Sequence, residues 1–427
     1  MMIRSRIRLV RSITFLTLKR VLVSLALLML TCGVASAAPP LATPFGQDVN
    51  DTIDAWLAFA KTNGGLSASN QASGLVLLAL LEKRVDATFN AVSQGYALST
   101  PTDQCLERNA VSGIIQAFNH VASGSFYAYV DGIDLLALSL YASTGGPNPN
   151  STADDCTIPA PYVPVTPLAV RTALDTLVDR TVPNQSIGGI NNGFWGYTGA
   201  GDDSSTTQFA AGGLAAAKGF YVSKGDPGTR IPGIDTALIT TRAGYAATQQ
   251  NPGTEGGWGY RPPEGYAISY QQTASGLWAS ELGGATVDDP TIQLALRWQQ
   301  NHYNYENILF AYNFWSYSYG YYLFSSCKAY ALLESQPPPS AGNIGTNDLG
   351  TLPADGIQGR LAQRDPTTDF DARIAFVGPN MSPGEYSAEI KRWYYDYAYT
   401  IMTRQNADGS DAEPYGAWDF WSNQAYY

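Results

Sequence analysis

Residues 193–214 read GFWGYTGAGDDSSTTQFAAGGL, and residues 257–277 read GWGYRPPEGYAISYQQTASGL. The two stretches share a Trp-Gly-Tyr core, and Trp195 and Trp258 are 63 residues apart. In each stretch a Gln follows the Trp by thirteen residues and a Gly-Leu pair follows it by eighteen. A repeat of this length in helical sequence predicts stacked helical hairpins, in which each unit buries the apolar face of its neighbour.

The repeated glutamines are Gln208 and Gln271, and a hydroxyl residue stands two positions before each of them. The C-terminal segment repeats the order of Trp, hydroxyl residue and Gln from Trp418 onward. A further Gln ends the preceding helix-like segment in each copy, at Gln185, Gln250 and Gln405. Three parts of the chain therefore carry the repeat.

Apolar residues recur at three- and four-residue spacing through most of the chain, interrupted by Gly, Pro and Asn clusters. The predicted helices cover 51–62, 71–84, 106–121, 132–142, 168–180, 206–222, 233–249, 269–282, 290–301, 311–334, 387–404 and 420–427. These segments form six pairs, and the second member of most pairs is apolar on all sides. Because such a helix must be enclosed by other helices, we expect an all-α fold with two helix layers.

The Trp-Gly-Tyr core and its following Gln resemble the prenyltransferase and squalene oxidase repeat, which is related to the Gln-Trp motif of terpenoid cyclases. The resemblance covers about 50–427 and is most specific at 185–282 and 404–427. It implies an α/α toroid of about six helical hairpins around a central cavity. The residues of its structural motif are Trp195, Gln208, Trp258 and Gln271. Since one fold serves many activities, the resemblance implies the fold more firmly than an activity.

We expect a single toroid domain over 38–427. Residues 335–388 interrupt the helical periodicity with many Pro, Gly and Asp residues, which predicts a loop-rich insertion between the fifth and sixth pairs. The sequence stops at Tyr427, three residues after the last repeated Gln. The last helix is therefore expected to be short, and the ring is expected to close imperfectly.

The N-terminal residues 1–37 are expected to be a signal peptide. Six basic residues precede an apolar run over 21–30, and Ala35-Ser36-Ala37 offers a small-x-small cleavage site. The apolar run is shorter than the ~20 residues that span a bilayer. Cleavage near Ala37 predicts a secreted or periplasmic protein with no stable membrane span.

Composition narrows the function classes further. Removal of 1–37 leaves 19 basic and 36 acidic side chains, a net charge of −17. Because phosphate contacts need clustered positive charge, a nucleic-acid partner is not expected. Two His and four Cys spread along the chain cannot form a tight zinc site, so we expect neither a metal nor a cofactor.

Three cysteines remain after the predicted cleavage. Cys105 and Cys156 lie in polar, loop-like sequence, whereas Cys327 lies in an aromatic, helix-like run. In an oxidising compartment we expect a Cys105–Cys156 disulfide and a buried, free Cys327.

Asp202 and Asp203 are the candidate catalytic residues. Two adjacent carboxylates beside an apolar cavity could raise one pKa and provide a general acid, which protonation of an alkene or epoxide requires. The structural alternative is that Asp203 or Ser204 caps the following helix. In terpenoid cyclases the acid lies in an Asp-x-Asp-Asp motif, whereas positions 200 and 201 here are Ala and Gly. Both alternatives stay open at the level of sequence.

Aromatic residues are densest at 312–322 and 418–427. Such rings could line a cavity for an isoprenoid, stabilise a carbocation or stack on sugar rings. The candidate ligand-binding residues are Trp315, Tyr317, Tyr319, Trp418 and Trp421.

The residues that two related families need for their activities are absent from this chain. A zinc prenyltransferase has an Asp two residues before its Cys ligand, whereas this chain has Ser325 two residues before Cys327. A thioester protein needs a Cys-Gly-Glu-Gln motif, which this sequence lacks. We therefore expect a protein that binds an apolar or mixed small molecule, lipid or glycan in an aromatic cavity. The alternatives are a terpenoid cyclase-like enzyme with an Asp general acid, and a toroid that binds or degrades saccharides or peptides.

Overall fold

A computed structural model describes residues 42–62, 73–88, 91–117, 126–148, 169–226, 228–261, 266–306, 319–357, 359–368 and 386–405. All of them belong to one compact unit, Ala42–Tyr427. Within the described residues the regular structure is helical, and extended pairing is limited to isolated bridges. The all-α prediction is therefore confirmed. The predicted signal peptide at 1–37 and the predicted helix at 420–427 lie outside the described residues.

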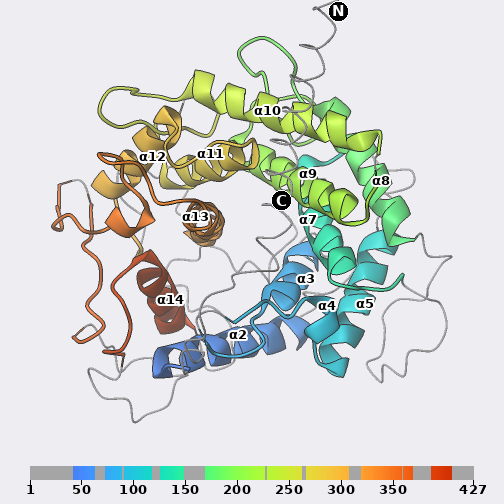
Figure 1. Ribbon diagram of the computed structural model, residues 1–427, viewed down its shortest axis with the longest axis horizontal. Helices are drawn as coiled ribbons and strands as arrows, with labels where there is room; N and C mark the ends of the chain where they lie inside the picture. Colours follow the sequence, from blue (N-terminus) through green and yellow to red (C-terminus); the bar gives the residue numbers. More distant parts are fainter. Residues whose placement is uncertain are drawn as a thin grey trace, which may run out of the picture. The chain divides into compact units, whose positions relative to one another are not determined.

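The helices follow the predicted segments closely (Figure 1). The N-terminal half contains α2 (Pro44–Thr62), α3 (Ser73–Glu82), α4 (Gly95–Leu98), α5 (Pro101–Ala117), α7 (Ala128–Ser143) and α8 (Val170–Thr181). The C-terminal half contains α9 (Ser204–Ser223), α10 (Arg230–Thr248), α11 (Tyr270–Leu282), α12 (Pro290–Asn301), α13 (Tyr319–Glu334) and α14 (Trp393–Arg404). Two short 3-10 turns complete them, η1 (Val182–Asn184) and η2 (Thr346–Asp348).

Several elements differ from the prediction, among them α2, which begins at Pro44 rather than at 51. The short helix α4 was not expected from the apolar spacing. Helix α5 begins five residues early because Pro101 can occupy the first helical position, where no N–H is needed. Helix α14 begins at Trp393 rather than at 387, since the amide of Glu389 donates to the carbonyl of Tyr386 in a turn and Arg392 is extended.

The helices that the sequence marks as apolar pack in series, and we call α3, α7, α9, α11 and α13 the apolar helices. Helix α7 contacts α3 and α9, and α11 contacts α9 and α13. Helices α5, α8, α10 and α12 pack against this series and are called the flanking helices, and all of them except α10 are more amphipathic than the apolar helices. Every residue of α11 from Tyr270 to Glu281 is buried, because neighbours cover it on all sides. The contacts thus form a series of apolar helices with flanking helices packed against it, and the inner and outer layers of a toroid stay a prediction.

Glycines bring α7 and α9 into backbone contact. A Cβ atom on Gly132 would lie 2.3 Å from the main-chain carbon of Phe209, and one on Gly213 would lie 2.4 Å from the carbonyl oxygen of Gly132. Only a residue without a side chain fits at such a crossing. The small residues of the apolar helices thus set the distance between them.

The two repeated tryptophans join each apolar helix to the flanking helix before it. Trp195 and Trp258 are fully buried. The indole Nε1 of Trp195 donates to the carbonyl of Thr181 in α8 over 2.8 Å, and that of Trp258 donates to the carbonyl of Tyr245 in α10 over 2.8 Å. Carbonyls at a helix C-terminus have no partner within the helix, so each indole satisfies one of these groups.

Glutamines at the ends of flanking helices connect consecutive pairs. Gln185 donates to the carbonyl of Ala237 in α10, and Gln249 donates to that of Thr291 in α12, both over 2.9 Å. The repeated residue Gln250 instead donates to the carbonyl of Tyr266. These contacts run across from one flanking helix to the next.

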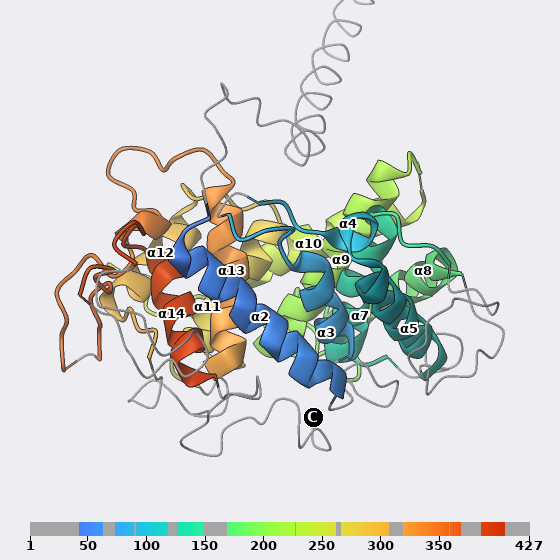
Figure 2. The same ribbon diagram turned by 90° about the horizontal axis from the view of Figure 1, so that it is seen from below.

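The last and first described helices share the same kind of contact. Helices α14 and α2 lie side by side (Figure 2), and Gln405, which caps α14, donates to the carbonyl of Thr52 in α2 over 2.9 Å. In addition, the Nζ of Lys328 in α13 pairs with the carboxylate of Glu82 in α3. This order of contacts is what a closed ring predicts, and the toroid itself stays a prediction.

The described part of the expected insertion contains only η2 and turns, and it packs closely onto the helices. The amide of Leu361 donates to the carbonyl of Tyr303 over 2.7 Å, and the amide of Arg364 donates to Asp396 Oδ1 over 2.9 Å. The guanidinium of Arg364 lies 4.6 Å from the ring centres of both Tyr305 and Tyr399. The segment thus connects the end of α12 to α14.

Two of the cysteines lie within the described residues. Cys105 is disulfide-bonded, and Cys327 is free as predicted but half-buried rather than buried. Cys156 lies outside the described residues, so its pairing with Cys105 stays a prediction. None of the helices in the described ranges combines the length and apolar character needed to cross a bilayer.

Candidate functional site

Most of the predicted ligand-binding residues cannot be placed. Trp315, Tyr317, Trp418 and Trp421 lie outside the described residues, and Tyr319 is described only through its backbone at the start of α13. Tyr321 of the same aromatic segment is described, and it belongs to a group of rings whose other members gave no signal in the sequence.

Five aromatic rings from four apolar helices meet around Phe209 of α9, and we call them the aromatic cluster. Ring centres lie 4.7 Å from Phe209 for Tyr129, 6.1 Å for Tyr321, 5.8 Å for Phe324 and 6.5 Å for Trp278. Phe209 and Trp278 are buried, whereas the other three rings are half-buried. The cluster thus combines a packed centre with ring surface that a ligand can touch.

The two phenols of the cluster stay neutral. Burial removes water from both hydroxyls. This desolvation is the largest influence that raises the pKa of Tyr321 well above its usual value, and it also raises the pKa of Tyr129. The Tyr321 hydroxyl lies 2.7 Å from Ser275 Oγ. The Asp203 charge is among the smaller influences that raise the Tyr321 pKa, so Asp203 lies within electrostatic range of the cluster.

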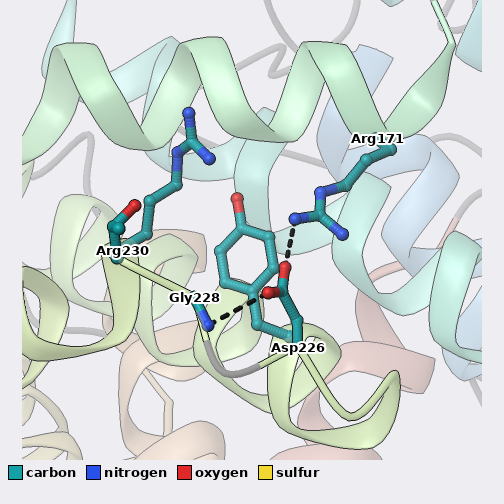
Figure 3. A pocket seen from close by; sticks show the side chains of 6 residues that line it. Arg171, Asp226, Gly228 and Arg230 are labelled. Carbon is teal, nitrogen blue, oxygen red and sulfur yellow. Dashed lines mark hydrogen bonds and ion pairs between the residues drawn. The ribbon is translucent and has the colours of Figure 1, made fainter.

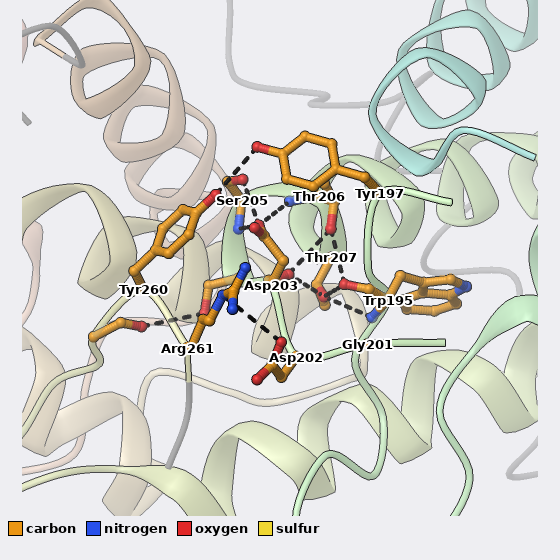
Figure 4. A network of polar contacts seen from close by, with 12 residues as sticks. Trp195, Tyr197, Gly201, Asp202, Asp203, Ser205, Thr206, Thr207, Tyr260 and Arg261 are labelled. Carbon is orange, nitrogen blue, oxygen red and sulfur yellow. Dashed lines mark hydrogen bonds and ion pairs between the residues drawn. The ribbon is translucent and has the colours of Figure 1, made fainter. Parts of the chain in front are cut away.

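Asp203 is the N-cap of α9, and its carboxylate faces its own helix (Figure 4). Oδ1 accepts hydrogen bonds from the amides of Ser205 and Thr206, over 2.8 and 3.0 Å, and from the Ser205 hydroxyl over 2.5 Å. Burial raises the pKa of Asp203, and hydrogen bonds from Ser205, Tyr260 and Thr206 oppose that rise. The capping alternative describes this geometry.

Asp202 has a different surrounding. Its side chain is 36% exposed, and its Oδ1 lies 3.9 Å from the Nε of Arg261, which is itself mostly exposed. An ion pair at this distance in solvent contributes little to stability. The two adjacent carboxylates are therefore held by separate partners.

Tyr197 and Tyr260, which belong to the repeated Trp-Gly-Tyr cores, meet beside Asp203. Their hydroxyl oxygens are 3.1 Å apart, and the Tyr260 hydroxyl lies near enough to the Asp203 side chain for each group to affect the pKa of the other. Tyr127 directly precedes α7, and its ring centre lies 5.7 Å from the ring centre of Tyr197. All three phenols are half-buried.

The main chain of the same two tyrosines explains their position. The amide of Ala128, first in α7, donates to the carbonyl of Tyr197 over 2.8 Å, and the amide of Ser204, first in α9, donates to that of Tyr260 over 3.2 Å. Each repeat thus closes the N-terminus of the apolar helix before it and brings a phenol to that point. The repeat was the available sequence signal for these tyrosines.

The direction of the hydrogen bonds makes this site rich in acceptors. An ionised carboxylate can only accept, so the Asp203 charge favours a Tyr260 hydroxyl whose proton points toward it and whose oxygen accepts from Tyr197. The oxygen of Tyr197 then has lone pairs for a further donor. With Asp202 nearby, the site favours a neutral or cationic ligand that donates hydrogen bonds.

A separate pocket of about 340 Å³ lies among α8, the end of α9 and the start of α10, and it includes Arg171, Asp226 and Arg230 (Figure 3). Asp226 joins the guanidinium of Arg171 to the amide of Gly228. Arg230 binds both oxygens of Asp179, over 2.7 and 2.6 Å. Because both guanidinium groups already have carboxylate partners, we interpret this pocket as a connection between helices.

No group of three or more His, Cys, Asp or Glu side chains in the described ranges is arranged to hold a metal ion. Comparison of the chain with protein-family models, curated proteins and solved structures finds no match. The functional interpretation therefore depends on the geometry of the chain itself.

Proposed function

We propose that the protein binds a small ligand of mixed apolar and polar character at the aromatic cluster and the adjoining Tyr197–Tyr260–Asp203 chain. The observation that carries the proposal is the meeting of half-buried aromatic rings from separate helices beside a set of hydrogen-bond acceptors. Ligand sites commonly combine an apolar lining with a few placed polar groups.

The chemistry of the site limits the chemical class of the ligand. The faces of Tyr129, Tyr321 and Phe324 suit a hydrocarbon or the apolar face of a ring. The hydroxyl of Tyr197 suits a donor such as an alcohol, and the carboxylates disfavour an anion. An isoprenoid or lipid alcohol and a neutral saccharide both have this character.

The remaining parts of the proposal come from the sequence. Export after cleavage near Ala37 would place the site outside the cytoplasm, and the toroid implied by the repeat would place the cluster toward a central cavity. The contact of Gln405 with Thr52 supports the ring, because it extends the connection between consecutive pairs to the two ends of the series.

A cyclase-like activity has less support. A general acid must present its proton to the substrate, whereas Asp203 Oδ1 is occupied by three donors of its own helix N-terminus. The other oxygen is buried without a hydrogen-bond partner among the described residues, and Tyr260 is the nearby phenol that affects the Asp203 pKa. In the proposed function Asp203 orients Tyr260 and acts on the ligand only through that hydroxyl.

The test is native mass spectrometry of the protein that begins at residue 38, incubated with an isoprenoid and lipid extract or with neutral oligosaccharides. We expect a retained species from one mixture, and at least tenfold weaker retention by Phe324→Ala and Tyr197→Phe. Ile239→Ala, at a 61% exposed position of α10, is the matched control and should bind normally. No retention from either mixture, or equal retention by all variants, contradicts the proposal.

A further inference from the structure

A buried acid outside the proposed binding site shares one serine hydroxyl with a main-chain carbonyl, and that hydroxyl can donate its proton to only one of the two. Glu107 in α5 is fully buried, and Ser99, the residue that ends α4, is 6% exposed. Ser99 Oγ lies 2.5 Å from the carbonyl oxygen of Gly95 and 2.6 Å from Glu107 Oε1. A hydroxyl has one proton and cannot donate to both oxygens.

A proton on Glu107 completes the chain. The acid then donates to Ser99 Oγ, and Ser99 donates to the carbonyl of Gly95. With an ionised Glu107, one of the two short oxygen contacts has no proton between its atoms. We propose that Glu107 and Ser99 form a pH-sensitive latch, which holds α4 in place when Glu107 is protonated and loosens it when Glu107 is ionised.

Helix α4 is small enough for such a latch to matter. Thr144 at the end of α7 accepts from the amide of Tyr96 through Oγ1 over 2.9 Å and from the amide of Ala97 through its carbonyl over 3.2 Å. From α5, Gln104 donates to the carbonyl of Tyr96 and Arg108 donates to its hydroxyl. Gly95 has a left-handed φ of 50°, and a Cβ there would lie 2.6 Å from Thr144 Cβ. A helix of only four residues belongs to the parts of a protein that open locally.

The surroundings of Glu107 favour its protonated form near neutral pH. Burial is the largest influence and raises the pKa of Glu107 to about 7, although the Ser99 hydrogen bond opposes this. Asp103 of α5 raises it further, whereas Arg108 of α5 and Lys61 of α2 lower it. Lys61 is itself paired with Asp103 over 3.0 Å, and Arg108 donates to the hydroxyl of Tyr96 in α4.

The sign of the pH dependence follows from linkage. The closed latch binds the proton more tightly than the open one, where an unperturbed Glu has a pKa near 4.5. Closing is therefore strongest at low pH and weakens as the pH rises from 4.5 through 7. Between pH 6 and pH 8 the equilibrium constant for closing should fall about tenfold.

Hydrogen exchange of the disulfide-bonded protein tests the latch. After correction for the intrinsic exchange rate, the amides of Leu98 and Ser99, which bond within α4, should be protected about tenfold less at pH 8 than at pH 6. Glu107→Gln, which has the shape of the protonated acid, should show the same protection at both pH values. Asp51→Asn, at an exposed acid of α2, is the control and should follow the wild-type protein.

Equal protection of the wild-type amides at both pH values would overturn the latch, as would an unchanged pH dependence in Glu107→Gln. If Glu107→Gln does not fold, the carboxyl carbon of Glu107 can be titrated by NMR in the wild-type protein. A midpoint near 7 supports the latch, and a midpoint near 4.5 refutes it.

Discussion

The side-chain amide of Gln405 donates to the main-chain carbonyl of Thr52 over 2.9 Å, although 353 residues separate them. Gln405 ends α14 and Thr52 lies within α2, the last and first described helices. Gln249 makes the corresponding contact from α10 to Thr291 of α12. The same local feature, a glutamine directly after a helix, therefore makes contacts both between consecutive flanking helices and between the last and first described helices.

Replacing Gln405 should loosen two helices that are distant in sequence. Gln405→Ala removes one partly buried hydrogen bond, and such bonds contribute about 0.5–1.5 kcal/mol. We expect faster hydrogen exchange in both α2 and α14 and a correspondingly lower unfolding midpoint in urea. Gln249→Ala is the comparison and should affect α10 and α12. A change confined to α14 in the first variant would contradict the connecting role.

A methyl group at Gly276 should be far more damaging than one at Gly219. A Cβ at Gly276 would lie 2.3 Å from the ring of Trp258, which is fully buried and cannot move aside. We expect Gly276→Ala to lower the free energy of unfolding by about 1–3 kcal/mol through overpacking.

The matched substitution is Gly219→Ala on the exposed side of α9, where a Cβ meets nothing within 4 Å. It should raise stability by about 0.5–1 kcal/mol, because alanine has less freedom to lose on forming a helix. Urea unfolding measures both variants, and a similar effect at the two sites would show that the Trp258 contact is not tight.

Asp203 should matter for stability through its cap. Asp203→Ala removes the acceptor for two helix amides, and loss of such a cap lowers stability by about 1–2 kcal/mol. Asp203→Ser retains a capping oxygen and should recover most of that loss. Asp202→Ala, at the exposed neighbour, should change little. If all three variants unfold at the same urea concentration, the cap has no energetic role.

Glu281 in α11 should destabilise the protein at neutral and alkaline pH. It is 6% exposed, both carboxylate oxygens lack a hydrogen-bond partner among the described residues, and burial raises its pKa well above the usual value. The folded state thus binds this proton more tightly than the unfolded state. Stability therefore falls as the pH rises above 4.5, by up to about 1.4 kcal/mol per pH unit, until the folded-state pKa is reached.

Glu281→Met replaces the acid by an apolar side chain of similar size. We expect it to exceed the wild-type stability by about 1–3 kcal/mol at pH 8, with the gain shrinking as the pH approaches 4.5. Unfolding curves at several pH values measure this difference. Glu306→Gln, at an acid whose side chain is 54% exposed, provides the control and should show no such trend. A constant difference at every pH would contradict the assignment to Glu281.

The candidate site was only partly accessible from sequence. Asp203 could be recognised because it stands just before an apolar helix, and the choice between cap and acid depended on which way its carboxylate turns. Phe209 gave no signal, since a single Phe in a small-residue helix is ordinary core sequence. Its position became informative only when α7, α11 and α13 brought Tyr129, Trp278 and Phe324 against it.

The sequence by itself determined the helices and their two kinds, because apolar spacing, proline and glycine act through contacts within a few residues. It also determined the repeat, with Trp195 and Trp258 as its markers. Only the tertiary structure decided which residues meet: that Tyr197 and Tyr260 share a hydrogen bond beside Asp203, and that Gln405 reaches Thr52. Such contacts depend on how several helices pack at once, and no local pattern specifies that packing.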